Sequence, residues 1–181
     1  MASPLSVSVR LVRPQDAAVL SHLETQNRAY LQAGGPVRSD DYVSVDGQAR
    51  LIDELLTRHE EGTCLPYLVE AGGAVVGRIL VTAIVRGGFQ SGSVGYWVAE
   101  SVAGRGIASA ALTRMVEIAF GPENLHRLEA ATTLANEASA RVLAKTGFEP
   151  YGVAPAYLFM DGHWVDHRLF QLVNDAWVEP S

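Results

Sequence analysis

Two glycines flank an arginine in the stretch AGRGIASAAL, residues 103–112. The stretch lies between a segment with strand pattern, SVGYWVA, and a segment with helical pattern. The first N–H groups of such a helix have no partner within it, and together with the positive end of the helix dipole they can hold an anion. Gly104 and Gly106 keep side chains away from these amides, and Ala108 and Ser109 keep the first turn narrow. The stretch predicts either a phosphate-binding loop or an ordinary tight turn.

A second motif, NEASARVLAKTGF, spans residues 136–148. Its pattern predicts a helix that is capped by Asn136 and ended by Gly147. Ser139 has no such structural duty. Its hydroxyl can bond the backbone of its own helix, or it can donate a proton into a site, and the sequence leaves both interpretations open.

Charge is unevenly distributed along the chain. The net charge is −6, but residues 102–147 hold five basic and four acidic side chains, so the rest of the chain carries −7. The negative total argues against a general nucleic-acid binder, which needs a basic surface to neutralise phosphates. An anionic ligand is therefore expected in the segment that holds the two motifs.

An alternation of strands and helices positions these motifs. Two hairpin turns are expected, at Gly72-Gly73 and at Asp161-Gly162. Strands are predicted at about 6–12, 65–71, 74–85, 93–99, 127–133, 149–159 and 164–173, and helices at about 15–29, 45–61, 108–120 and 136–146. This order predicts an α/β (α+β) fold with a mixed sheet, antiparallel in its first half and followed by a helical crossover.

Length and composition bound the class of protein. A chain of 181 residues that is 48% hydrophobic predicts a single domain, residues 1–181. No apolar run is long enough for a signal peptide or a membrane span, so a cytoplasmic protein is expected. The single cysteine, Cys64, lies in an apolar run and is expected to be a buried small hydrophobe.

Taken together, GYWVAESVAGRGIASAAL and NEASARVLAKTGF resemble the acetyl-CoA site of the GNAT acetyltransferase superfamily. NRAYLQAGGPVR, VVRGGFQSGSVGYWV and YLFMDGHWVDHRLF are similar to its RimJ/RimL branch, and to RimJ more than to RimL. That branch acetylates the N-terminal amine of ribosomal proteins. The resemblance implies a GNAT fold with acetyl-CoA as cofactor, in which a mostly antiparallel sheet of about seven strands is splayed at the cofactor site and flanked by about four helices.

The resemblance also implies roles for individual residues. Ser139 is expected to protonate the departing thiolate after direct attack by a neutral amine. Ala103 stands where the family usually has glutamine or arginine, which removes a side-chain contact but no backbone amide. The expected cofactor-binding residues are Tyr96, Trp97, Val98, Gly104, Arg105, Gly106, Ile107, Ala108, Ser109, Asn136 and Ser139.

The general base is the main departure from the relatives. They carry a carboxylate just before the tyrosine that matches Tyr157, and this chain has Ala156 there. Glu24 and Asp166 are the candidates that remain, each acting through water, although either can serve in a structural ion pair instead. The base is therefore unassigned.

The acceptor side is expected to involve residues from several segments, and Arg28 can equally brace a turn. His163 and His167 lie four apart on one strand face without a clustered acid, so no metal site is expected. Trp164 is expected in the core. The expected substrate-binding residues are Asn27, Arg28, Arg38, Arg86, Phe89 and Tyr157.

The function expected is acetyl-CoA-dependent N-acetylation of a primary amine, most naturally the N-terminal α-amine of a protein. One alternative is acetylation of a small amine such as an antibiotic or polyamine. The other is a non-catalytic acyl-CoA-binding module. A protein or peptide N-terminus, or a small amine, is the expected partner, with no nucleic acid and no membrane, and the chain is expected to be a monomer or a homodimer.

Overall fold

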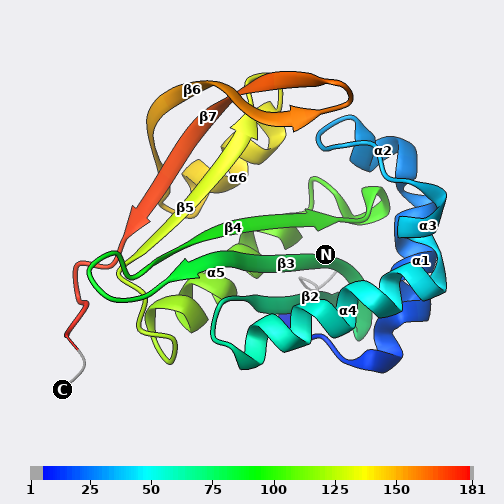
Figure 1. Cartoon of the computed structure of the whole chain (residues 1–181), viewed down its shortest axis with the longest axis horizontal. Coiled ribbons are helices and arrows are strands. Elements are labelled where there is room, and N and C mark those ends of the chain that lie inside the picture. Colours follow the sequence, from blue (N-terminus) through cyan, green and yellow to red (C-terminus); the bar gives the residue numbers. More distant parts are fainter. Residues whose placement is uncertain (1–5, 180–181) are drawn as a thin grey trace, which may run out of the picture.

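The computed structural model describes residues 6–179 and shows one mixed sheet of seven strands. The strands lie in the order β1-β2-β3-β4-β5-β7-β6, and every neighbouring pair is antiparallel except β4 and β5 (Figure 1). The strands are β1 (Val7–Leu11), β2 (Leu65–Ala71), β3 (Ala74–Val85), β4 (Ser91–Val98), β5 (Arg127–Thr133), β6 (Glu149–Met160) and β7 (His163–Val173). The expected fold, mostly antiparallel with about seven strands, is confirmed.

Helices cover both faces of this sheet. The helices are α1 (Ala17–Gln26), α2 (Arg28–Gln32), α3 (Asp40–Val43), α4 (Val45–Glu60), α5 (Ile107–Phe120) and α6 (Glu137–Lys145). On one face Leu20 of α1 and Ile52 of α4 pack against Leu68 of β2. On the other, Leu112 of α5 and Leu143 of α6 belong to the larger core cluster. Burial on both faces fixes the sheet between two helical layers.

The parallel pair β4 and β5 is joined through α5, which is the predicted crossover. These two strands pair only where residues 91–93 meet residues 127–129. Beyond that point they diverge, and Figure 1 shows the opening between them with α6 behind it. The divergence leaves backbone and side chains of both strands free to line a site.

The acceptor-side segment differs from the prediction. A helix was expected over 15–29, but α1 ends at Gln26 and two short helices, α2 and α3, follow. The side-chain amide of Asn27 donates to the backbone carbonyl of Leu23, and such a local side-chain bond competes with continuation of the helix. A single turn such as α3 is too short for periodicity to reveal. Within residues 6–179 the α-helices therefore number six rather than about four.

Two further expectations have opposite outcomes. Cys64 is fully buried, as expected, and burial raises the pKa of its thiol. The expectation for Trp164 is wrong, because 62% of this residue is exposed. It lies beside the β6–β7 turn and packs only edge-on against Phe159, with 5.6 Å between the ring centroids. Trp164 lies beyond the part of β7 that pairs with β5, and its register partner is Phe159 of the edge strand β6.

No helix in residues 6–179 is long and apolar enough to cross a membrane. The expectation of no signal peptide depends partly on residues 1–5, which lie outside the described residues.

Candidate active site

A groove of about 860 Å³ crosses the opening between β4 and β5. Its walls come from β3, the end of β4, the start of α5, the length of α6, the segment that contains α2, and Glu24 of α1. The two sequence motifs, which are some thirty residues apart, therefore share one groove. Five basic and two acidic side chains line it, namely Arg28, Arg38, Arg78, Arg141, Lys145, Glu24 and Glu137.

The glycine loop forms the start of α5 as predicted. Gly104 and Gly106 have φ angles of 72° and 80°, which favour glycine, and Gly106 is the N-cap residue. No side chain caps this helix, so its first N–H groups are left for a ligand. Ile107, Ala108 and Ser109 line the groove with the two glycines, whereas Arg105 is exposed and does not. The geometry favours the interpretation as an anion-binding loop over an ordinary turn.

Ser139 lies in the first turn of α6 and faces Tyr96 of β4. The side chain of Asn136 caps the helix by accepting from the Ser139 N–H at 3.0 Å. The Ser139 hydroxyl does not bond its own helix but lies 3.0 Å from the Tyr96 hydroxyl. Burial raises the pKa of Tyr96 to about 12, so its phenol stays protonated at neutral pH and can donate to Ser139. The sequence marked Tyr96 as a cofactor contact and missed this pairing of hydroxyls.

A smaller chamber of about 140 Å³ opens behind this pair. It shares Gly95, Tyr96, Asn136 and Ser139 with the groove and is closed on the far side by His167 of β7. His167 is 3% exposed. Sequence reasoning considered this histidine only as a metal ligand, and its position behind Ser139 depends on the pairing of β7 with β5.

At the other end of the groove Glu24 is buried and contacts Arg78. The Arg78 Nη2 atom lies 3.2 Å from Glu24 Oε1, and Tyr42 and Gln48 also bond this guanidinium. Burial raises the pKa of Glu24, and the charges of Arg78 and Arg38 act in the opposite direction. The carboxylate is therefore held in a buried ion pair, one of the two roles expected for it.

The other charged side chains of the groove on this side are cationic. Arg38 lines the groove with its guanidinium 4.4 Å from the centre of the Tyr42 ring. Arg28 also lines it, but it bonds Asp40 and the carbonyl of Arg38, so it braces the turn as well.

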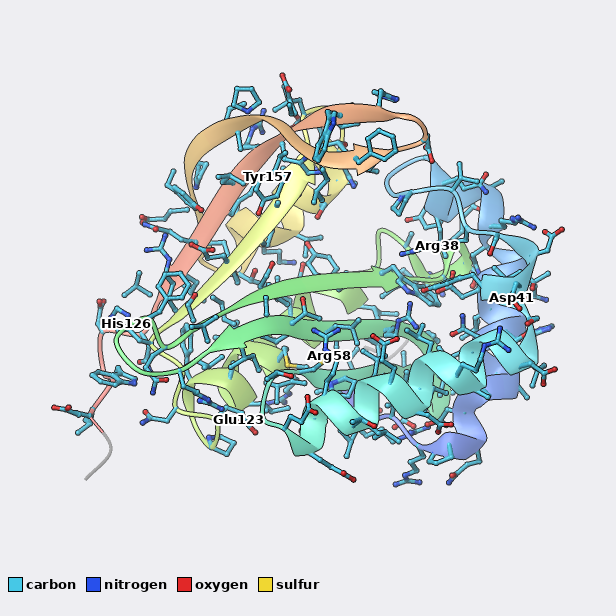
Figure 2. All side chains as sticks on the ribbon, in the orientation of Figure 1. Arg38, Asp41, Arg58, Glu123, His126 and Tyr157 are labelled. Carbon is cyan, nitrogen blue, oxygen red and sulfur yellow. The ribbon has the colours of Figure 1, made fainter. Side chains whose placement is uncertain are left out.

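Six of the predicted site residues do not line the groove, namely Arg105, Asn27, Arg86, Phe89, Tyr157 and Asp166. Asn27 is buried and is used structurally, since it accepts from the N–H of Glu100. Arg86 bonds Glu123, which Figure 2 shows at the end of the molecule away from Arg38, and Phe89 lies three residues further along that turn.

The last two of these residues belong to the β6–β7 hairpin. Asp166 is exposed, and its carboxylate accepts from the N–H of Ala156. Ala156 has a φ of 48° within the bulge of β6, so Asp166 holds this bulge. Tyr157 lies in the same bulge and packs against His167, with 5.4 Å between the ring centroids. A bulge shifts which side chains face the splay, and single-sequence periodicity does not show it.

Within residues 6–179 no group of three or more histidine, cysteine, aspartate or glutamate side chains could hold a metal ion. The groups that line the site include backbone amides, hydroxyls, cationic side chains, an imidazole and a buried ion pair.

Known proteins are similar to this chain in both sequence and fold. The [ribosomal protein uS5]-alanine N-acetyltransferase of Escherichia coli is 33% identical over 174 residues, covering 93% of this chain and 88% of that protein. The crystal structure of ribosomal-protein-S5-alanine acetyltransferase from Vibrio fischeri has a TM-score of 0.90 at 31% identity and covers 96% of each chain. Mycobacterium smegmatis RimJ in complex with CoA-disulfide also has a TM-score of 0.90 at 31% identity, over 98% of this chain and 88% of that one.

The family model described as an acetyltransferase (GNAT) domain matches residues 7–149, which include the glycine loop, Tyr96 and Ser139. Because this match covers more than half of the 181 residues, the chain belongs to the GNAT acetyltransferase family and is an N-acetyltransferase.

Proposed function

We propose that the protein transfers the acetyl group of acetyl-CoA to the N-terminal α-amine of a protein or peptide. The observation that carries the proposal is the groove across the splay, with an anion-binding helix terminus at one end and a cationic acceptor region at the other. Two similar proteins support it. The RimJ structure is a complex with CoA-disulfide, and the name of the Escherichia coli enzyme gives an alanine of a ribosomal protein as its substrate.

The residues present fit an acetyl-CoA molecule. The free N–H groups at the start of α5 suit a pyrophosphate, and Arg141 and Lys145 of α6 add positive charge on the same groove. The unpaired edge of β4 after residue 93 offers backbone groups to the pantetheine amides. Bound there, acetyl-CoA supplies an activated acetyl group as a thioester.

The protein's own groups then handle charge and protons. We propose that Ser139 donates the proton that the leaving sulfur needs, because Ser139 lines both cavities and its hydroxyl lies within hydrogen-bond distance of the protonated Tyr96. The N–H groups of β4 near Val98 are candidates to stabilise the oxyanion. Glu24 lies in the groove, but Arg78 holds its carboxylate, so we propose that it organises the acceptor end rather than taking the proton.

Charge also distinguishes the two classes of acceptor. A polyamine or a cationic antibiotic needs an acidic pocket, whereas Arg28, Arg38 and Arg78 line this end of the groove together with the single carboxylate of Glu24. A peptide α-amine carries one charge, and its ordinary pKa near 8 leaves a sizeable fraction neutral at pH 7. The groove therefore favours a peptide N-terminus over a small polycation.

The test is a panel of acceptors with release of free CoA as the readout. Wild-type protein is incubated with acetyl-CoA and either N-terminal peptides or small amines such as spermidine and an aminoglycoside. We expect kcat/KM for the best peptide to exceed that for every small polycation. A polycation that outperforms all peptides would overturn the acceptor assignment, and CoA binding without turnover on any amine would favour a binding module.

A further inference from the structure

His167 is a buried histidine to which the proposed function assigns no role. It comes from β7 and closes the small chamber into which Tyr96 and Ser139 also face. Only 3% of the residue is exposed, and the ring of Tyr157 covers it from β6. Its side chain is therefore held in one place, in the lining of the same chamber as the proposed proton donor Ser139.

One hydrogen bond fixes the protonation of this ring. The Nδ1 atom lies 2.9 Å from the carbonyl oxygen of Val165. A carbonyl oxygen can only accept, so Nδ1 carries the proton and donates it, which leaves a lone pair on Nε2. In the described part of the chain no hydrogen bond reaches Nε2, and His167 is one of the residues that line the chamber. The basic nitrogen is therefore not engaged by another group of the described residues.

The chamber contains no competing acid or base of comparable strength. Its described lining includes no carboxylate, lysine or arginine, and its titratable groups are His167 and Tyr96. Thr132 and Thr133 of β5 and Ser139 of α6 also line the chamber.

The charged neighbours of His167 along β7 are engaged elsewhere. Successive side chains of a strand point to opposite faces, so Asp166 and Arg168 turn away from the chamber. Asp166 accepts from the N–H of Ala156, and Arg168 lies 3.7 Å from Glu137 of α6. From β6 the titratable group that packs against His167 is Tyr157.

We propose that His167 is the general base that takes the proton from the acceptor amine, with Nε2 as the accepting atom. This inference rests on the proposed acetyl transfer and names the base that Ala156 does not supply. Imidazole side chains ordinarily change charge between about pH 5 and 8. A general base is most effective when its pKa lies near the working pH, so an imidazole suits catalysis near neutral pH. Glu24, the alternative carboxylate, lines the groove but not this chamber, and Arg78 holds it.

The protons and bonds balance in this scheme. The amine nitrogen forms a bond to the acetyl carbon while the bond from that carbon to sulfur breaks. One proton leaves the nitrogen for Nε2 of His167, and one passes from the Ser139 hydroxyl to the sulfur. The imidazolium proton then replaces, by way of solvent, the one that Ser139 gave up. The net change is amine plus thioester to amide plus thiol.

The first test compares two histidines of the same strand. His167→Asn keeps an N–H donor for the Val165 carbonyl but removes the basic Nε2, and the control is His163→Asn at the exposed end of β7. We expect His167→Asn to lower kcat on the order of 10²-fold, with unchanged acetyl-CoA affinity by calorimetry, whereas the control stays near wild type. In a His167→Gly variant, added imidazole is expected to restore part of the rate.

Two further measurements do not depend on activity of a variant. Nitrogen NMR of ¹⁵N-histidine protein is expected to show the Nδ1–H tautomer for His167, and an Nε2–H tautomer would contradict the role. In wild type, the low-pH limb of kcat is expected at the same pH for two peptides whose α-amines differ in pKa.

The outcomes separate this inference from the proposed function. A low-pH limb that moves with the acceptor, or a His167→Asn variant within threefold of wild-type kcat, would overturn the base assignment and leave acetyl transfer intact. A wild-type protein that acetylates no peptide would overturn the proposed function and the inference with it.

Discussion

The cofactor side and the acceptor side of this molecule are built differently. On the cofactor side, the two helix termini are fixed within a few residues, by Gly104 and Gly106 at the start of α5 and by Asn136 at the start of α6. On the acceptor side, contacts join residues 54 apart between Glu24 and Arg78, and 124 apart between Val37 and Asp161. Anion binding needs only a helix terminus, whereas acceptor recognition depends on how distant segments meet.

The largest expected effect concerns the glycine loop. Gly106 has a φ of 80°, which a β-branched residue adopts only at high cost, so Gly106→Val should reorient the free N–H groups of α5. We expect acetyl-CoA affinity to fall about 100-fold, which corresponds to about 2.7 kcal/mol, in isothermal titration calorimetry. The matched control is Gly87→Val, with a φ of 73° in the distant β3–β4 turn, and it should leave affinity unchanged. Undiminished affinity in Gly106→Val would refute the phosphate-loop assignment.

The next effect concerns the leaving group. If Ser139 protonates the sulfur, Ser139→Ala should lower kcat on the order of 10²-fold with little change in acetyl-CoA affinity. Thr146→Ala on the same helix removes a hydroxyl that bonds only α6 carbonyls, and it should leave kcat near wild type. Steady-state kinetics with one peptide acceptor measures both variants. A wild-type rate in Ser139→Ala would return this serine to a structural role.

Tyr96 is expected to act as a positioning residue for Ser139. Tyr96→Phe removes a hydroxyl that lies 3.0 Å from the Ser139 hydroxyl and 3.3 Å from the Ser139 carbonyl oxygen. Loss of the bond to the Ser139 hydroxyl, worth about 1 kcal/mol, should lower kcat roughly fivefold without changing KM for acetyl-CoA. In a double-mutant cycle the loss should disappear when Ser139 is already alanine, because the two side chains act together. Fully additive losses would show that Tyr96 acts independently of Ser139.

The smallest effect tests where the two sides touch. Gly34, in the loop after α2, lies so close to Asn136 that an added Cβ would approach Asn136 Nδ2 to 2.9 Å. Gly34→Ala should therefore displace the Asn136 side chain and lower kcat/KM by about threefold, the cost of one strained rotamer. Gly88→Ala, which meets nothing within 4 Å, is the control. Equal kinetics in both variants would show that the sides are uncoupled here.

The same contrast explains what the sequence could predict. Hairpin glycines, alternating strands and the α5 crossover reveal the sheet, and helix caps reveal the cofactor loop and Ser139, because these signals are local. The short helices after Asn27, the bulge at Ala156 and the exposure of Trp164 leave no periodic signal of their own, so periodicity misses them. The role of His167 could not be predicted from the sequence, because it depends on the pairing of β7 with β5, which brings His167 into the lining of the chamber that Ser139 also lines.

The most direct test of the central claim is competition within one acceptor. A peptide with a free N-terminus and an internal lysine is incubated with wild-type protein and acetyl-CoA at pH 7, and the acetylated nitrogen is located by fragment-ion mass spectrometry. A lysine amine, with an ordinary pKa near 10.4, is almost wholly charged at this pH, whereas the α-amine is partly neutral. The account predicts acetylation of the α-amine first and almost exclusively. Preferential acetylation of the lysine, or none on the peptide while spermidine is acetylated, would contradict it.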